Sequence, residues 1–228
     1  VVYRRRAGSP PAAPEPSREP AERPAAPLPA RKPRAQAPQP PPAEHAARAA
    51  PAAPTASDQD IASWYAEALE HCHGDRQPEA LRAVERILDT RPFHVRGRVL
   101  QAYLYGSRGE FWSAVAECTK ALDIDPLWAQ AYLLLGMLLE QQGEVDSALL
   151  EVKRALFLDP DLPLGYFTLG KLYRSLGMPQ AAAREFANTA RLLESRPGIA
   201  LAGDIPVEFD RTVLLQLANK QVDGATER

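Results

Sequence analysis

The 228-residue chain lacks features on which several classes of protein depend. It has two cysteines, Cys72 and Cys118, so no disulfide framework can hold it together. It has no apolar run near the roughly 20 residues that a membrane-spanning helix needs. It also has no glycine-rich phosphate loop and no pair of carboxylates in a catalytic context. We therefore expect a cytoplasmic chain that is not an enzyme and does not insert into a membrane.

Residues 1–57 lack tryptophan, phenylalanine and isoleucine, and they hold 15 of the 23 prolines. Such a composition cannot bury enough apolar surface to offset the entropy lost on ordering. We predict a disordered linker rich in proline, alanine and arginine over 1–57. Its basic clusters at 4–6 and 31–34 have no aromatic residues between them, so we expect no binding of nucleic acid. The linker is basic, whereas the remainder of the chain carries 18 Lys and Arg against 25 Asp and Glu.

The remainder of the chain has a repeat of 34 residues, which proline, glycine and alanine share without insertions. The positions that keep this step are Pro92, Pro126 and Pro160; Gly109, Gly143 and Gly177; and Ala80, Ala114, Ala148 and Ala182. Four units result, at 61–94, 95–128, 129–162 and 163–196. Small residues such as Gly136 and Ala148 indicate places where two helices approach closely, and the prolines end the second helix of a unit.

The period and the residue types in it resemble the tetratricopeptide repeat. The resemblance implies an all-α solenoid of four helix-turn-helix units. Ser57 with Asp60 is a helix-start pattern, so we place the folded domain at 58–222. An apolar face near 207–221 predicts a C-terminal capping helix after a loop at 197–204, since a solenoid needs its open end covered. Residues 223–228 are expected to be a disordered tail.

The stretch His71-Cys72-His73 contains three side chains able to bind metal. Neighbours one and two residues apart on a helix point in different directions, so these three do not converge. Cys118 falls at a core position of the second unit, where packing explains it. We expect no metal site and no cofactor in this chain.

In a tetratricopeptide solenoid the first helix of each unit lines an inner groove. The positions that map onto that face, and that we predict to bind a protein partner, are Tyr65, Leu69, Arg96, Val99, Tyr103, Gln130, Leu133, Met137, Phe167, Lys171 and Arg174. Aromatic residues, Met and Arg are enriched at protein interfaces. Chaperone-binding members of the family hold a terminal carboxylate with a Lys/Asn clamp, and this chain does not have that clamp.

The segment ALFLDPDLPLGYFTLGKLYRSLG, residues 155–177, together with the helix that follows it, resembles the last repeats of some bacterial chemotaxis receptor (CheR-type) methyltransferases. The matching residues are Leu158, Asp159, Pro160, Asp161, Phe167, Leu169, Gly170, Leu172, Arg174, Ala182, Phe186, Asn188, Leu192 and Leu193. The first six residues, VVYRRR, resemble the end of the methyltransferase domain running into a linker.

This resemblance implies a parent enzyme that transfers methyl groups from S-adenosylmethionine to receptor glutamates. Its catalytic and cofactor residues would lie upstream of residue 1, and the present chain would target or regulate it. The expected partner is a chemoreceptor or another chemotaxis signalling protein. The alternative is a generic tetratricopeptide scaffold for another bacterial complex, such as a secretion or pilus system.

Overall fold

The computed structural model describes residues 56–74, 76–207 and 210–226. The predicted linker over 1–57 lies outside the described residues apart from its last two. The segment interpreted as the end of an upstream domain, residues 1–6, also lies outside them, as do the last two residues of the predicted tail.

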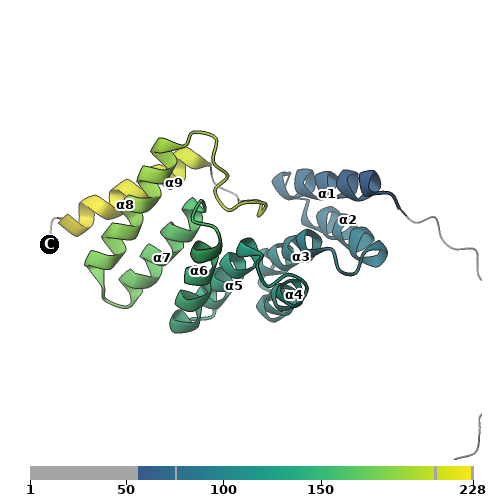
Figure 1. Ribbon diagram of the computed structural model, residues 1–228, viewed down its shortest axis with the longest axis horizontal. Helices are drawn as coiled ribbons and strands as arrows, with labels where there is room; N and C mark the ends of the chain where they lie inside the picture. The colour runs from purple at the N-terminus through teal and green to yellow at the C-terminus, as the bar shows by residue number, and fades with distance from the viewer. Residues whose placement is uncertain (1–55, 75, 208–209, 227–228) are drawn as a thin grey trace, which may run out of the picture. The chain divides into compact units, whose positions relative to one another are not determined.

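Within those ranges the chain forms nine α-helices and no strand (Figure 1). They are α1 (Asp58–His73), α2 (Gln77–Thr90), α3 (Val95–Ser107), α4 (Phe111–Ile124), α5 (Ala129–Gln141), α6 (Val145–Leu158), α7 (Pro163–Ser175), α8 (Pro179–Ser195) and α9 (Arg211–Thr226). Helices α1 to α8 form four pairs that coincide with the four predicted units, and each packs on its neighbours in the chain. The tetratricopeptide-type solenoid is therefore confirmed. No helix in the described part of the chain is long and apolar enough to cross a membrane.

The turns within three of the units use a left-handed glycine. Gly109, Gly143 and Gly177 have φ values of +77°, +83° and +70°, which residues other than glycine rarely adopt. The glycines that keep the 34-residue step therefore form the turns between the paired helices. Between units, helices α2, α4 and α6 each end two residues before the repeating proline, because proline disfavours helical geometry in the residue ahead of it.

A small residue recurs at the eighth place of every unit. Ala68, Ala102, Gly136 and Gly170 are all buried. A Cβ added at Gly136 would lie 2.5 Å from Cγ2 of Val152 in the paired helix, so only glycine fits there. The close approach predicted at Gly136 is confirmed.

The two ends of the helical stack are set by side-chain caps. Ser57 and Asp60 form the predicted capping box: the Asp60 amide donates to the Ser57 hydroxyl at 3.2 Å, and the Ser57 amide donates to the Asp60 carboxylate at 2.8 Å. At the other end, the capping helix begins later than the predicted residue 207. Asp210 accepts a hydrogen bond from the Val213 amide at 2.9 Å and starts the helix at Arg211.

Helix α9 packs on α8 and covers the open end of the fourth unit. Leu214 and Ala218 are fully buried there, whereas Val213 and Leu217 are 42% and 39% exposed. The helix continues to Thr226, so its last turn extends beyond the predicted boundary at residue 222. The connection from α8 to α9 spans residues 196–210, whereas the other helices are joined by three or four residues.

Candidate protein-binding groove

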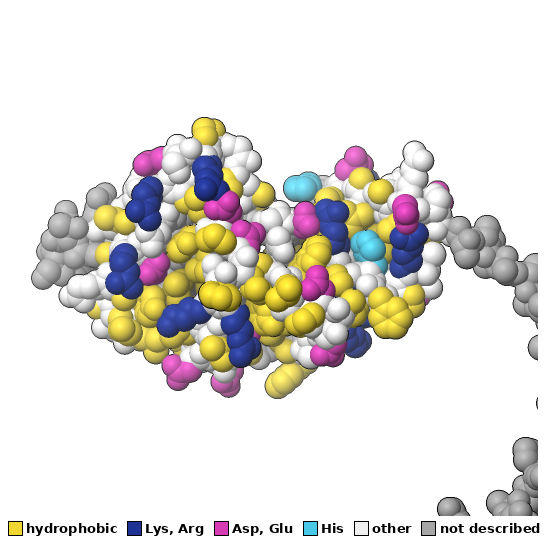
Figure 2. Space-filling model, viewed as in Figure 1, with side chains coloured by type: hydrophobic (Ala, Val, Ile, Leu, Met, Phe, Trp, Pro, Cys, Tyr) yellow, Lys and Arg dark blue, Asp and Glu magenta, His cyan; other side chains and the backbone are white. Residues whose placement is uncertain are grey.

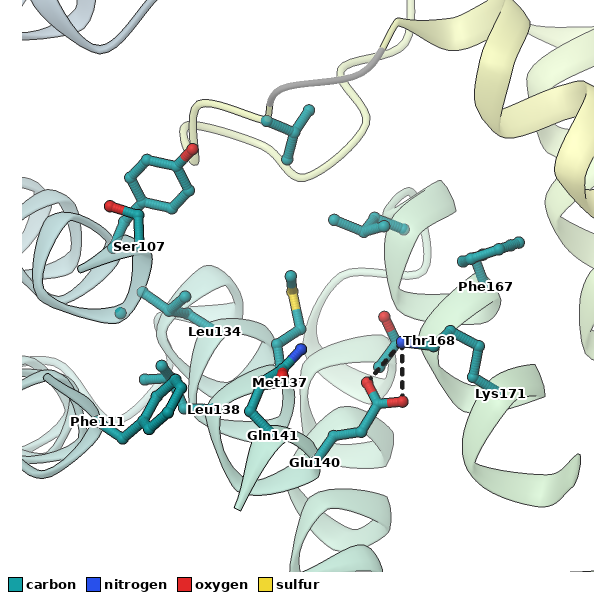
Figure 3. A pocket seen from close by; sticks show the side chains of 14 residues that line it. Ser107, Phe111, Leu134, Met137, Leu138, Glu140, Gln141, Phe167, Thr168 and Lys171 are labelled. Carbon is teal, nitrogen blue, oxygen red and sulfur yellow. Dashed lines mark hydrogen bonds and ion pairs between the residues drawn. The ribbon is translucent and has the colours of Figure 1, made fainter. Parts of the chain in front are cut away.

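A pocket of about 490 Å³ lies between the first helices of units two, three and four. Met137 of α5 stands between side chains of α3 and α4 on one side and those of α7 on the other (Figure 3). The residues that line the pocket are Tyr103, Gly106, Ser107, Phe111, Leu134, Met137, Leu138, Glu140, Gln141, Leu164, Phe167, Thr168, Lys171 and Val207. Most of them are apolar or aromatic, which suits burial of side chains from a binding partner.

One ion pair forms part of this pocket wall. The Lys171 ammonium lies 2.8 Å and 2.9 Å from the two carboxylate oxygens of Glu140 (Figure 3). The pair joins α7 to α5 and is partly exposed, so it contributes at most about 1 kcal/mol to stability. It places one charge of each sign beside the apolar surface, where each can contact a polar group of a partner.

Part of the inner surface outside the pocket is contacted by the chain itself. Residues 199–207, which we name the crossing segment, extend from the α8 end of the stack toward α3 (Figure 1), so that Leu201 contacts the start of α7 and Asp204 pairs with Arg96 of α3. Ala202 and Ile205 are buried in the same core cluster as Val99 and Leu133. The Leu164 amide at the start of α7 donates a hydrogen bond to the Leu201 carbonyl at 2.9 Å.

Arg96 holds the far end of the crossing segment. Its guanidinium lies 3.0 Å from the Asp204 carboxylate and 4.6 Å from the centre of the Tyr65 ring, in cation–π geometry. Burial raises the pKa of the Tyr65 phenol, so this ring is neutral at physiological pH. Next to Asp204, Gly203 has a φ of +61° and leaves no room for a Cβ against the Gln130 side chain.

The structure divides the eleven predicted groove residues among three environments. Those that line the open pocket are Tyr103, Met137, Phe167 and Lys171. Those that contact the crossing segment, share its core cluster or stack with Arg96 are Tyr65, Arg96, Val99, Gln130 and Leu133. The other two are Leu69, which packs in the core of the first unit, and Arg174, which donates to Gln221 of α9.

Only part of the predicted groove is therefore open to solvent. Val99 and Leu133 are 4% and 0% exposed, and they belong to the same core cluster as Ala202 and Ile205 of the crossing segment. The expectation of a loop at 197–204 did not include this contact with the core. A signal was present, because Ile199, Leu201, Ile205 and Val207 make this connection unusually apolar for a surface loop.

Several residues that line the pocket are absent from the predicted groove, each for its own reason. Phe111 begins the second helix of its unit, and the prediction covers first helices alone. Glu140 lies one turn beyond Met137 on the same face of α5, so the spacing of three residues was an available signal. Val207 belongs to the crossing segment.

Neither cysteine is suited to act as a nucleophile. Burial raises the pKa of the Cys118 thiol to about 12 and that of Cys72 to about 11, which keeps both protonated. Within the part of the chain that the structure describes, no three His, Cys, Asp or Glu side chains gather as a candidate metal site.

Comparison with known proteins supports a tetratricopeptide-repeat region. The family model of a tetratricopeptide repeat matches residues 129–162, which are the third predicted unit. A crystal structure of MamA protein is similar over 75% of this chain and 92% of its own, with a TM-score of 0.50 and 22% identity. No curated protein sequence matches.

Two further solved structures share the fold. An O-GlcNAc transferase mutant from Thermobaculum terrenum matches 58% of this chain and 26% of its own, at 24% identity and a TM-score of 0.55. The first tetratricopeptide-repeat domain of Spaghetti (RPAP3), bound to an HSP90 peptide, matches 55% of this chain and 99% of its own, at 18% identity and a TM-score of 0.50. The fold and these comparisons define a helical solenoid of the tetratricopeptide-repeat type.

Proposed function

We propose that the pocket between α3, α5 and α7 binds a segment of a chemotaxis protein, and that this binding targets or regulates a receptor glutamate methyltransferase. The observation that carries the binding role is the pocket itself: aromatic and aliphatic side chains from three units converge around one ion pair. Figure 2 shows hydrophobic side chains, with Lys and Arg among them, over the middle of the repeat stack. Such mixed surfaces are typical of protein interfaces.

The methyltransferase part of the proposal rests on the sequence resemblance over about residues 155–222. The enzyme would use S-adenosylmethionine and would lie upstream of this chain in a cytoplasmic parent protein. None of the residues described here would bind that cofactor or take part in the chemistry. The partner is a chemoreceptor or another chemotaxis signalling protein.

A bound peptide is a reasonable form for the partner segment. The Spaghetti domain holds an HSP90 peptide on the same fold. In this chain the clamp places for a terminal carboxylate hold Tyr65, Val99, Leu133 and Phe167, of which the first three are buried. We therefore infer an internal partner segment that inserts apolar side chains beside Phe167, rather than a chain terminus.

Calorimetry with the cytoplasmic part of a chemoreceptor tests the proposal on the full 228-residue chain. Tyr103→Ala and Lys171→Ala should each weaken binding about 5- to 30-fold, the range of an interface residue worth about 1–2 kcal/mol. Matched controls are Trp112→Ala, on an 84% exposed side chain of α4, and Lys220→Ala on the exposed face of α9. The controls should change affinity less than about twofold.

Circular dichroism of each variant separates lost binding from lost structure. Equal losses in pocket and control variants would place the interface elsewhere. If no chemoreceptor or chemotaxis protein binds, while components of a secretion or pilus system do, the module is a scaffold of a different complex.

A further inference from the structure

We propose that the crossing segment, residues 199–207, is a built-in ligand, and that the natural partner is an extended segment of the same chemistry that displaces it. This inference deepens the proposed function and rests on it. The surface that the crossing segment occupies is then a second binding surface, next to the open pocket. The partner segment that binds there carries apolar side chains around one acidic residue.

The length of the connection is the first reason. The neighbouring helices α7 and α8 are joined by three residues, and α9 packs directly on α8. A connection of three or four residues would therefore suffice for capping. The chain instead uses residues 196–210, and connections of this length are uncommon in compact domains unless they have a function. The additional residues bring Asp204 to Arg96, which is two units away.

The contacts of the crossing segment are those of a bound peptide. Ala202 and Ile205 are buried in the core cluster that also contains Val99 and Leu133 of the first helices. One backbone hydrogen bond, from the Leu164 amide to the Leu201 carbonyl, fixes the register. At protein interfaces, an extended segment is recognised through a few buried side chains and a polar contact at the edge.

The same contacts define the partner. Arg96, stacked on Tyr65, presents its guanidinium to a carboxylate, and both partners of this ion pair are partly exposed. The acidic residue lies between two apolar ones, Ala202 two positions before it and Ile205 directly after it. Gly203 precedes it because a Cβ there would meet Cγ of Gln130 at 2.7 Å. The partner segment is therefore of the form apolar, glycine, acidic, apolar.

Displacement is within reach of an ordinary partner. The crossing segment is tethered at both ends, so its effective concentration at the groove is on the order of millimolar, as for other short tethers. The apparent affinity of a partner falls in proportion to the fraction of molecules in which the groove is free. Weakening the segment should thus raise the affinity of a partner rather than lower it.

The test uses a synthetic peptide with the sequence of residues 199–207, IALAGDIPV. In one variant of the full chain, these nine residues are replaced by a Gly/Ser linker of equal length. By calorimetry, the peptide should bind this variant at least about tenfold more tightly than the unmodified chain. The peptide with Asp204→Asn should bind the same variant at least about threefold more weakly, and so should the unchanged peptide when Arg96→Gln is added.

A second measurement needs no replacement and covers the case in which the replaced variant fails to fold. In the unmodified chain, the Leu164 amide should exchange its hydrogen through an opening that depends little on urea, whereas core amides of α5 exchange only by global unfolding. Asp204→Asn should speed exchange at Leu164 severalfold and leave α5 unchanged. Exchange of Leu164 only by global unfolding would overturn the proposal, as would a folded replacement variant that does not bind the peptide.

The experiments can reject the crossing segment as a ligand and the chemotaxis partner independently of each other. Peptide binding to the replaced variant, with no chemotaxis protein binding to any form, would uphold the crossing segment as a ligand and reject only the chemotaxis partner. Loss of chemoreceptor binding in Tyr103→Ala, with no binding of the peptide to the replaced variant, would uphold the chemotaxis partner and reject the crossing segment as a ligand.

Discussion

Replacing Gly136 by alanine sets two effects of known size against each other. In the interior of a helix, alanine is more favourable than glycine by about 1 kcal/mol, because glycine loses more backbone freedom on folding. In this structure, however, a Cβ at residue 136 would lie 2.5 Å from Cγ2 of Val152. It would also lie 3.2 Å from the Ala148 carbonyl oxygen and the Val152 amide nitrogen. Helices α5 and α6 would have to move apart.

Overpacking of a closed core costs about 1–3 kcal/mol. The upper half of this range applies, because two of the three atoms belong to the backbone and the third to a β-branched side chain with little rotational freedom. After the gain in helix propensity, we expect Gly136→Ala to lower the free energy of unfolding by about 1–2 kcal/mol. Urea titration followed by circular dichroism measures this as a lower midpoint at an unchanged slope.

Two other glycines serve as controls for the same assay. A Cβ added at Gly198 would have nothing within 4 Å, and its φ is not positive, so Gly198→Ala should change stability by less than about 0.5 kcal/mol. Gly143 has equally open surroundings but a φ of +83°, so Gly143→Ala should lose about 1–2 kcal/mol through backbone strain alone. A Gly136→Ala variant that is more stable than the original chain would refute the inferred contact between α5 and α6.

Three further outcomes are expected. Ala148→Leu, at a fully buried site, should lower the free energy of unfolding by about 1–3 kcal/mol in the same titration. Gly203→Ala should loosen the crossing segment, seen as faster hydrogen exchange there, because both its φ of +61° and the Gln130 side chain oppose a Cβ. Burial raises the pKa of Cys118 to about 12, whereas the unfolded thiol ionises near its usual 9.0. The free energy of unfolding should therefore fall as the pH rises from about 9 toward 12, as alkaline urea titrations would show, and Cys118→Ala should lessen that fall.

The repeat fold could be predicted because its determinants are local and periodic. Prolines 34 residues apart mark the ends of the second helices, and Gly109, Gly143 and Gly177 mark the turns. The capping box at Ser57 needs only four consecutive residues. Each of these signals acts within one turn of backbone, so the sequence shows it directly.

The candidate site could be predicted only in part, because its contacts are distant and follow no period. Arg96 and Asp204 are 108 residues apart, and nothing in the spacing of either residue connects them. The inward face of the first helices did identify Tyr103, Met137, Phe167 and Lys171 as pocket residues. That these residues bind a protein stays a prediction.

The contact between Arg96 and Asp204 also changes how the molecule should fold. In a stack whose units touch only their neighbours, folding can start anywhere and the ends can unfold separately. Here the connection between α8 and α9 contacts the second unit, so the crossing segment docks only after units two to four are in place. Those units should then melt in one cooperative transition. Because this contact joins distant parts of the chain, folding should also be slower than for an open stack of equal length.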